Sequence, residues 1–407
     1  MSSGKTVVFV NHNAGSPIYG PNLRTYYAAK HLVLQGYSVH VFSGSFSHKY
    51  MTMPKTSGKV TCENIDGINY YWIKTIKYNS LITRIISFHQ FSSMLYRAVI
   101  ENVRSMQAII CSSPPPVSVK ICYKLARKYN ARFIFDVRDL WPLTILEMNP
   151  LSKFNPYVVY IGHLEKYAYT HCDCVVSALP CAENYMIDNG LPNDRFISVE
   201  NGTEISESYP VSEHDLPVDT REALTSNKQF VVGYAGAFDR DNDLETLIDA
   251  AALLRNQDIE FVLVGKGEGR KRLAAKASGL SNVFIVSPVR SDQVPWVLAR
   301  FDACYMGLKA KSIFQYGVSM NKIFEYMRAS RPIISAIDAG NDIVSDSGCG
   351  MTVSSEDPQA VADAVKNIAN MASQERRTLG QRGLAYLEKN HTYDVLVNGW
   401  IRAIEGS

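Results

Sequence analysis

The residues best suited to chemistry lie close together between positions 318 and 335. Ser319 stands where it can cap a short helix, and Asn321 and Lys322 then fall in the first turn. Glu325 follows Lys322 by three residues, so both side chains share one face. A helix N-terminus and a lysine attract phosphate, while a carboxylate can accept two hydrogen bonds from a vicinal diol such as ribose. The spacing indicates a nucleoside diphosphate at a helix start, although an ordinary amphipathic helix would show the same pattern.

A second group of charged residues follows a predicted strand in the first half of the chain. Asp136, Arg138 and Asp139 lie beside Trp141, and ligands of parallel sheets bind at the carboxyl ends of strands. We therefore predict a role in the site. The alternative is a buried Asp–Arg pair that only braces the loop.

Glycines follow several predicted strands, where the backbone must approach a ligand closely. Gly20 precedes the first helix, and Gly236 follows the first strand of the second half. The string from Gly265 to Gly269 resembles a dinucleotide fingerprint, but Arg270 occupies the third glycine position. We predict a tight strand-to-helix turn there, and no NAD site.

The acidic run from Asp239 to Asp243 could suggest a metal site. An EF-hand would need glycine where Leu244 stands and glutamate where Ala250 stands, so that interpretation fails. Capping of the next helix is favoured, with Arg240 facing an anion. The sequence contains no H-E-x-x-H, C-x-x-C or P-loop pattern, and we predict no metal and no cofactor. Among the histidines, His12 alone follows a predicted strand at a site-like position.

Short apolar strands alternate with helical patterns twice along the chain, which predicts an α/β fold with two tandem Rossmann-like, doubly wound domains. The expected strands of the first half are Thr6–Val10, Ser38–Phe42, Tyr70–Ile73, Ala108–Cys111, Phe133–Val137, Cys174–Ser177 and Phe196–Val199. Those of the second half are Phe230–Tyr234, Glu260–Val264, Val283–Val286, Ala303–Met306, Pro332–Ala336 and Gly350–Val353. The expected divisions are a domain over 1–205, a polar linker over 206–228, a domain over 229–390, and a helix over 391–407 that returns to the first domain. Such a pair of domains places ligands in the cleft between them.

The 407 residues are 46% hydrophobic and 20% charged, as in globular proteins. Residues 1–200 contain 20 Lys and Arg against 12 Asp and Glu, although the whole chain has a net charge of only +3. Two basic stretches, Lys74–Arg104 and Lys120–Arg132, alternate with apolar residues. They suit an anionic membrane surface or a pair of solvated helix faces, and no nucleic-acid motif accompanies them. With no signal peptide, no membrane-spanning run and no disulfide pattern, a cytoplasmic location is expected, peripheral on the inner face of the plasma membrane.

Several strings occur in order over nearly the whole chain and carry a family resemblance. They are the Gly20 loop with Arg24, Cys111-Ser-Ser-Pro-Pro115, Asp136-Val-Arg-Asp-Leu-Trp-Pro142, Glu200-Asn-Gly-Thr203, Gly233-Tyr-Ala-Gly236, Val264-Gly-Lys-Gly267 and Asn321-Lys-Ile-Phe-Glu-Tyr-Met327 with Arg331-Pro-Ile-Ile334. The chain resembles retaining, nucleotide-sugar-dependent glycosyltransferases of family four, which have the GT-B fold. It is most similar to the bacterial O-antigen and capsule branch that includes N-acetyl-fucosaminyl transferases.

The resemblance implies a role for each candidate residue. Asp136, Arg138 and Asp139 would form the catalytic and acceptor side, together with the loop of Gly20. The implied donor-binding residues are Gly20, Gly236, Arg240, Gly265, Ser319, Asn321, Lys322, Glu325, Gly340, Asn341 and Asp342. Among them, Lys322 would hold the diphosphate, Glu325 the ribose, and Gly340–Asp342 the donor sugar. The donor would be a nucleotide sugar, UDP-linked, and the acceptor a lipid-linked or other saccharide.

Three positions depart from the family pattern. Gly317 stands where the first of two glutamates is usual, Asp241-Asn242 replaces a Lys-Gly pair, and Arg138 replaces a histidine. These departures keep two alternatives open beside a glycosyltransferase. One is a nucleotide-sugar epimerase, and the other is an inactive partner protein with the same fold.

Overall fold

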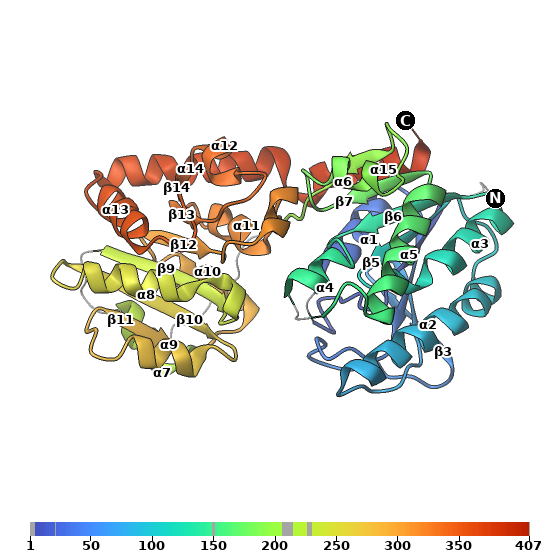
Figure 1. The fold of residues 1–407 in the computed structure, drawn as a ribbon, viewed down its shortest axis with the longest axis horizontal. Helices are drawn as coiled ribbons and strands as arrows, with labels where there is room; N and C mark the ends of the chain where they lie inside the picture. Colours follow the sequence, from blue (N-terminus) through green and yellow to red (C-terminus); the bar gives the residue numbers. More distant parts are fainter. Residues whose placement is uncertain (1–4, 21, 149–150, 206–214, 226–229, 407) are drawn as a thin grey trace. The chain divides into compact units, whose positions relative to one another are not determined.

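The structure is a computed structural model that describes residues 5–20, 22–148, 151–205, 215–225 and 230–406. The chain forms two compact units, and many of their elements are labelled in Figure 1. The first unit comprises Met1–Asn201, Tyr316–Ser319 and Tyr393–Ser407, and the second comprises Gly202–Gln315 and Met320–Thr392. The chain therefore returns twice to the first unit, once through a segment of four residues and once through the last helix.

The first unit is built on an eight-stranded sheet with the order β3-β4-β2-β1-β5-β6-β7-β8. Its strands are β1 (Thr6–Val10), β2 (Ser38–Gly44), β3 (Val60–Ile65), β4 (Ile68–Ile73), β5 (Ala108–Ser113), β6 (Arg132–Val137), β7 (Cys174–Ser177) and β8 (Phe196–Ser198). Its helices are α1 (Arg24–Leu34), α2 (Leu81–Asn102), the 3-10 turn η1 (Pro116–Ser118), α3 (Val119–Tyr129), α4 (Leu143–Met148), α5 (Pro156–His171), α6 (Glu183–Asp188) and α15 (Tyr393–Glu405).

Strand β1 shows why this sheet is buried on both faces. Val7 and Phe9 belong to one apolar cluster, while Val8 and Val10 belong to another, because successive side chains of a strand point to opposite faces. The second of these clusters includes Phe91 of α2, and the first includes Trp400 of α15. Helices thus cover both faces, as a parallel sheet requires.

The second unit is built on a six-stranded parallel sheet with the order β11-β10-β9-β12-β13-β14. Its strands are β9 (Phe230–Ala237), β10 (Ile259–Lys266), β11 (Val283–Val286), β12 (Ala303–Gly307), β13 (Ile333–Ala336) and β14 (Gly350–Val353). Its helices are α7 (Val218–Thr225), α8 (Leu244–Leu253), α9 (Arg270–Lys276), α10 (Val294–Leu298), α11 (Asn321–Arg328), α12 (Ile343–Ser347), α13 (Pro358–Ala369) and α14 (Ser373–Asn390), with 3-10 turns η3 (Arg240–Asn242), η4 (Ser291–Gln293) and η5 (Ser312–Tyr316). The strand order reverses direction between β9 and β12, and ligands of doubly wound sheets bind at such a point.

The predicted α/β class with two doubly wound domains is confirmed, and every predicted strand is present with bounds shifted by a few residues at most. Strand β3 was missed. It pairs antiparallel with β4 at the sheet edge, and its partly exposed, polar residues give no apolar run to recognise. The predicted linker spans 206–228. Two parts of it, 206–214 and 226–228, lie outside the described residues. Between them, Val218–Thr225 forms α7 of the second unit, so this part is helical.

None of the helices in the described ranges is long and apolar enough to cross a bilayer.

Candidate functional site

Lys322 is the central cation of the second unit. It stands in the first turn of α11, and its Nζ donates to Asn242 Oδ1 at 2.8 Å while lying 5.0 Å from the centre of the Tyr234 ring. Burial lowers the pKa of Lys322 to about 8, and the Asp239 carboxylate opposes the shift. Among the residues that the structure describes, the Lys322 ammonium is held against an amide and an aromatic ring and forms no ion pair with a carboxylate. An anionic ligand would supply that missing countercharge.

Glycines at the carboxyl ends of two neighbouring strands make room for this lysine. A Cβ at Gly236 would lie 2.7 Å from Lys322 Cε, so the lysine stem occupies the space that a side chain would need. Gly265 pairs with Gly236 in the sheet, and a Cβ there would lie 1.9 Å from the Gly236 carbonyl oxygen. The predicted turn after β10 is present, since Gly267 and Gly269 both pack against the backbone of Phe238. These glycines keep the strand ends of β9 and β10 close to the start of α11.

Glu325 lies one turn beyond Lys322 and is already paired within the second unit. Its carboxylate forms an ion pair with Arg328 at 2.9 Å and accepts a hydrogen bond from Thr203 Oγ1 at 3.3 Å. Arg328 also donates to the Glu204 carbonyl oxygen at 3.4 Å, which fixes the guanidinium. Two-thirds of the Glu325 side chain is shielded, with 33% of its surface exposed. The carboxylate is thus held in one place and keeps lone pairs for a diol.

The prediction that Ser319 caps α11 is wrong. Met320 occupies the N-cap position, and Ser319 Oγ instead accepts a hydrogen bond from the Asn201 backbone N–H at 2.7 Å. Asn201 Nδ2 also donates to the Ser319 carbonyl oxygen at 2.7 Å. Ser319 therefore belongs to the first unit, as the end of the four-residue return segment. Asn321 does begin α11 and is exposed.

The acidic run Asp239–Asp243 precedes α8 as predicted, but the predicted capping by its side chains is not seen in the described part of the chain. Asp243 occupies the N-cap position with φ of 40°, but within the described residues its carboxylate accepts no capping hydrogen bond. Asp241 forms an ion pair with Lys311 at 2.5 Å. Arg240 lies 3.8 Å from Glu268 in an exposed pair, and its side chain is 75% exposed. Arg240 can turn toward an anion at little cost, because an exposed ion pair contributes at most about 1 kcal/mol.

The loop Gly340–Asp342 follows β13 on the same edge of the sheet as Gly236. Gly340 N–H donates to the Phe314 carbonyl oxygen at 2.9 Å, which anchors the loop. Asp342 caps α12 by accepting from Ser345 N–H at 3.0 Å, and it also accepts from Thr352 Oγ1 at 2.9 Å. Asn341 is half-buried. The Asp342 carboxylate shapes this loop, so the backbone and Asn341 are the groups suited to a sugar.

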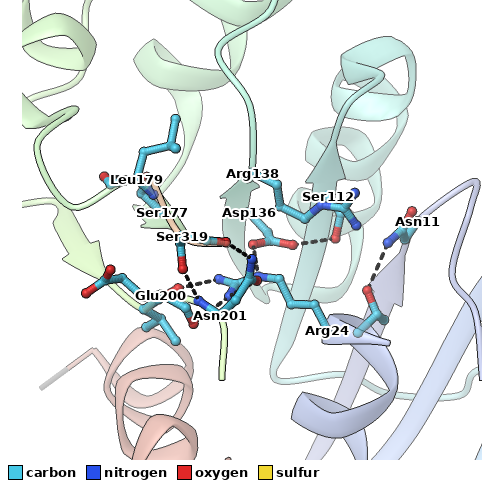
Figure 2. A network of polar contacts seen from close by, with 12 residues as sticks. Asn11, Arg24, Ser112, Asp136, Arg138, Ser177, Leu179, Glu200, Asn201 and Ser319 are labelled. Carbon is cyan, nitrogen blue, oxygen red and sulfur yellow. Dashed lines mark hydrogen bonds and ion pairs between the residues drawn. The ribbon is translucent and has the colours of Figure 1, made fainter. Parts of the chain in front are cut away.

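A buried polar network connects the strand ends of the first unit, and Figure 2 shows its members. Asp136 is 1% exposed and accepts from Ser112 Oγ at 2.7 Å and from Arg24 Nε at 3.4 Å. Arg24 also donates to the carbonyl oxygens of Val199 at 2.6 Å and Glu200 at 2.8 Å. Both carboxylate oxygens of Asp136 are therefore occupied. This geometry favours the bracing alternative for Asp136, with Arg24 and not Arg138 as its partner.

Arg138 and Asp139 lie nearer the surface than Asp136. Arg138 donates to Asn22 Oδ1 and so ties the end of β6 to the loop of Gly20, while burial lowers the pKa of its guanidinium. Asp139 is exposed. Gly20 has φ of 120°, and a Cβ there would lie 3.0 Å from the Met51 backbone nitrogen. The structure thus brings Arg138 and the Gly20 loop together, and Asp139 is the carboxylate of this group that can reach a ligand.

His12 is connected to this group through Asn13, because its Nδ1 lies 3.2 Å from Asn13 Oδ1 and the Asn13 carbonyl oxygen accepts a hydrogen bond from Asn22 Nδ2 at 2.6 Å. Its ring lies edge-on to Phe88 at 4.8 Å and to Phe91 at 5.1 Å, and it is 4% exposed. Burial lowers the pKa of His12 to about 4, so the imidazole is neutral at pH 7. It packs as part of the apolar interior.

Gly317 shows why the expected first glutamate is missing. Its φ is 94°, which disfavours any side chain, and a Cβ would lie 2.7 Å from Pro180 Cδ. The backbone conformation of the return segment and the contact with Pro180 therefore strongly disfavour an acid at this position. At the second departure, Asp241 stands where the family pattern has a lysine and forms its ion pair with Lys311, while the buried amide of Asn242, where the pattern has a glycine, accepts the hydrogen bond from Lys322.

The residues of these networks that were not predicted as site residues include Arg24, Thr203 and Arg328. The first two lie in strings that carry the family resemblance, which was the available signal. Arg328 gives a weaker signal, since it follows Glu325 by three residues and shares its helix face. Among the described residues, no three His, Cys, Asp or Glu side chains converge in a way that could hold a metal ion.

Comparisons with known proteins agree with the geometry of the second unit. Residues 229–371 match the family model described as "Glycosyl transferases group 1". A stretch of 126 residues is 29% identical to WcaI of Escherichia coli (strain K12), a protein named as a colanic acid biosynthesis glycosyl transferase. That match spans 30% of this chain and 30% of the length of WcaI.

Solved structures of low sequence identity share the fold over the whole chain. Sucrose-phosphate synthase from Thermosynechococcus elongatus superposes with a TM-score of 0.73 at 16% identity, covering 99% of this chain and 98% of that one. An E. coli trehalose-6-phosphate structure bound with UDP-2-fluoro glucose gives 0.74 at 12% identity, covering 99% of each chain. Anabaena HepE in complex with UDP and glucose gives 0.66 at 14% identity, covering 98% of this chain and 99% of the other. The fold is GT-B, and together these findings support a glycosyltransferase of the group 1 type.

Proposed function

We propose that this protein transfers a sugar from a UDP-linked donor to a lipid-linked or saccharide acceptor in the synthesis of a bacterial surface polysaccharide. The second unit holds the donor, and the first unit presents the acceptor. The observation that carries the proposal is Lys322, a half-buried ammonium on the Gly236 backbone whose hydrogen-bond partner is an uncharged amide. A diphosphate is a ligand whose negative charge this ammonium would neutralise.

The donor would make two kinds of contact. Its diphosphate would accept from Lys322 Nζ and from backbone N–H groups at the start of α11, with Arg240 turning in from its exposed pair. Its ribose diol would donate to Glu325, which Arg328 and Thr203 hold in place. The loop of Gly340 and Asn341 would then face the sugar. UDP complexes are known for the similar fold of HepE, which supports UDP as the nucleotide.

The reaction would proceed by stabilising the leaving diphosphate. The bond between the sugar C1 and the diphosphate oxygen breaks, and an acceptor hydroxyl bonds to C1 on the same face, with retention. The hydroxyl proton passes to the leaving phosphate. Lys322 and the helix start neutralise the charge that develops there, so no metal step is included.

Acceptor contacts are assigned to the loop of Gly20 with Arg138 and Asp139 of the first unit. The similarity to WcaI, a protein of colanic acid biosynthesis, supports a polysaccharide pathway. The resemblance to N-acetyl-fucosaminyl transferases suggests an amino sugar as the unit transferred. The site of action would be cytoplasmic, on the inner face of the plasma membrane, where lipid-linked saccharides are built.

Calorimetry with UDP and GDP tests the donor assignment. We expect UDP to bind, and Glu325→Ala to raise its Kd about tenfold or more while the circular dichroism spectrum is unchanged, because two charge-assisted hydrogen bonds are lost. Glu388→Ala, an exposed glutamate of α14, serves as the matched control. Unchanged UDP affinity in Glu325→Ala would refute the ribose assignment.

A second candidate is an inactive partner protein with the same fold. It is favoured by the backbone that disfavours an acid at Gly317 and by the uncharged Asn242 beside Lys322. An epimerase is the third possibility, and it would convert a free nucleotide sugar without any acceptor. Incubation of a UDP-sugar with and without a lipid-diphosphate saccharide separates the three outcomes. Acceptor-dependent UDP release supports transfer, acceptor-independent conversion of the sugar supports an epimerase, and no turnover supports the inactive partner.

A further inference from the structure

The first unit exposes an apolar surface that the donor and acceptor assignments leave unused. It consists of the first turns of α2 and of residues 154–160, which lead into α5 and form its start, and we call it the α2–α5 face. Its members are Leu81, Ile82, Ile86, Phe154, Val159 and Tyr160. Between 37% and 78% of each side chain is exposed. Single exposed apolar residues are common, so the significance of these six depends on whether they are contiguous.

The two helices meet at this surface. Ile82, Ile86 and His89 are spaced by four and three residues, which places them on one side of α2. The His89 ring lies 5.5 Å from the Tyr160 ring of α5. The exposed isoleucines of α2 therefore continue into the exposed start of α5.

Basic residues border the α2–α5 face. Lys74 and Lys77 precede α2 and are exposed, Arg84 lies within it, and Lys153 precedes α5 with its Nζ 5.3 Å from the centre of the Phe154 ring. Neither 74–100 nor 151–164 contains an acidic residue. A helix with exposed aliphatic side chains and neighbouring basic residues is suited to an anionic membrane surface. The basic side chains bind the lipid head groups, and the aliphatic ones contact the adjoining acyl chains.

The other basic stretch of the sequence lacks this combination. Helix α3 exposes Lys120, Lys124, Arg127 and Lys128, but among its residues, all of which the structure describes, no large apolar side chain is strongly exposed. The Lys124 ammonium lies over the Tyr96 ring at 4.7 Å. Helix α3 therefore presents a solvated basic surface, and the structure separates two stretches that look alike in the sequence.

We propose that the α2–α5 face docks on an anionic membrane, with Ile82 and Ile86 entering the acyl boundary and the basic border contacting head groups. This deepens the proposed function, on whose membrane location it rests, by naming the surface that contacts the lipid. The start of α2 also leads to the acceptor loop. His48 Nδ1 lies 3.0 Å from Tyr78 Oη, and the Met51 N–H donates to the Tyr19 carbonyl oxygen at 2.9 Å, next to Gly20. Docking would hold the Gly20 loop near the lipid surface, where a lipid-linked acceptor has its head group.

Co-sedimentation of the full chain with vesicles tests this proposal. Vesicles of phosphatidylglycerol and phosphatidylcholine should bind the protein, and vesicles of phosphatidylcholine alone should bind it at least tenfold more weakly. Ile82→Ser with Ile86→Ser should reduce binding at least tenfold. Lys74→Gln with Lys77→Gln should reduce it about 30-fold, since each basic residue near an anionic surface contributes about 1 kcal/mol, or about fivefold.

Matched controls change the same residue types elsewhere. Leu34→Ser with Leu253→Ser removes exposed leucines, and Lys124→Gln with Lys128→Gln neutralises α3. Both should leave vesicle binding within about twofold of the unchanged protein. Circular dichroism and UDP calorimetry check folding and donor binding separately, so failure of the proposed transferase would not alter the vesicle result.

Four results would overturn the proposal. They are absence of vesicle binding, equal binding to neutral vesicles, unchanged binding in the Ile82 and Ile86 variant, and a loss caused by the α3 variant instead. A change in oligomeric state of the Ile82 and Ile86 variant by light scattering, without a change in vesicle binding, would assign the face to a second copy of the chain.

Discussion

The lowered pKa of Lys322 predicts that donor affinity depends on pH. With a pKa of about 8 in the free protein, the ammonium is mostly charged at pH 7 and mostly neutral at pH 9. A diphosphate favours the charged form, so the pKa of Lys322 rises when UDP binds. Below pH 8 the lysine is already mostly protonated, so UDP binding is accompanied by little proton uptake and the Kd is nearly constant. Above pH 8 each binding event must first protonate the lysine, and the Kd rises.

The size of the effect follows from the protonated fraction. Above the free pKa, the Kd should increase about tenfold per pH unit, which corresponds to about 1.4 kcal/mol of binding free energy. Between pH 7 and pH 9.5 the total change is about 30-fold. It ends only where the lysine of the complex itself loses its proton.

Calorimetry with UDP from pH 6.5 to 9.5 measures this dependence. Repeating the titration at pH 8.5 in two buffers of different ionisation enthalpy should show uptake of about 0.8 proton per UDP bound. Lys322→Met is the comparison variant. It should bind UDP about tenfold to 100-fold more weakly at pH 7, the loss of one charge-assisted hydrogen bond, and retain only the pH dependence of UDP itself. Equal slopes for the two proteins, or a constant Kd up to pH 9, would refute the proposed contact of Lys322 with diphosphate.

The remaining predictions concern one glycine of the donor site and two buried carboxyl groups of the first unit. Gly236→Ala should raise the Kd for UDP several-fold and also lower stability, because the new Cβ would lie 2.7 Å from Lys322 Cε and 2.9 Å from the hydroxyl of the buried Tyr234; unchanged UDP calorimetry would contradict this. Arg24→Met should destabilise the protein by about 3–5 kcal/mol in urea unfolding, because it leaves the buried Asp136 carboxylate without its ion-pair partner; a loss under 1 kcal/mol would show that Asp136 does not need it. Glu165, between the hydroxyls of Tyr169 and Tyr185, has a pKa raised to about 8 by burial, so the folded state binds more protons than the unfolded state between about pH 4.5 and 8. Its contribution to stability should therefore fall by up to about 1.4 kcal/mol per pH unit as pH rises through that window, and Glu165→Gln should flatten the dependence seen in urea titrations.

Much of the donor side could be predicted from the sequence because its determinants are local. Lys322 and Glu325 share one helix face by their spacing alone, and Gly236 and Gly265 follow apolar strands that could be recognised by length and composition. The predicted bounds of the strands agree with the structure to within a few residues for the same reason. Each lies between turn residues and consists of a short apolar run, except for the polar edge strand β3.

Partners that are distant in the sequence were decided only by the tertiary structure. Asp136 was predicted as a site residue, with a bracing Asp–Arg pair as the alternative, and the fold brings Arg24 to it from the start of α1, 112 positions earlier. Ser319 was expected to cap the helix that follows it, but Asn201 binds it instead. The return segment also sets the positive φ of Gly317, which disfavours the expected glutamate. No local pattern encodes these contacts, since they depend on which strand ends the sheet order brings together.

The sequence by itself determined the two doubly wound domains and the placement of Lys322 and Glu325 on one face at a helix start, because periodicity and spacing along one element suffice for both. Tertiary structure alone decided which charged residues brace the fold and which remain available to a ligand. It also decided which of two similar basic stretches carries exposed isoleucines. Burial depends on what the rest of the chain packs against each side chain, and that information is spread over the whole sequence.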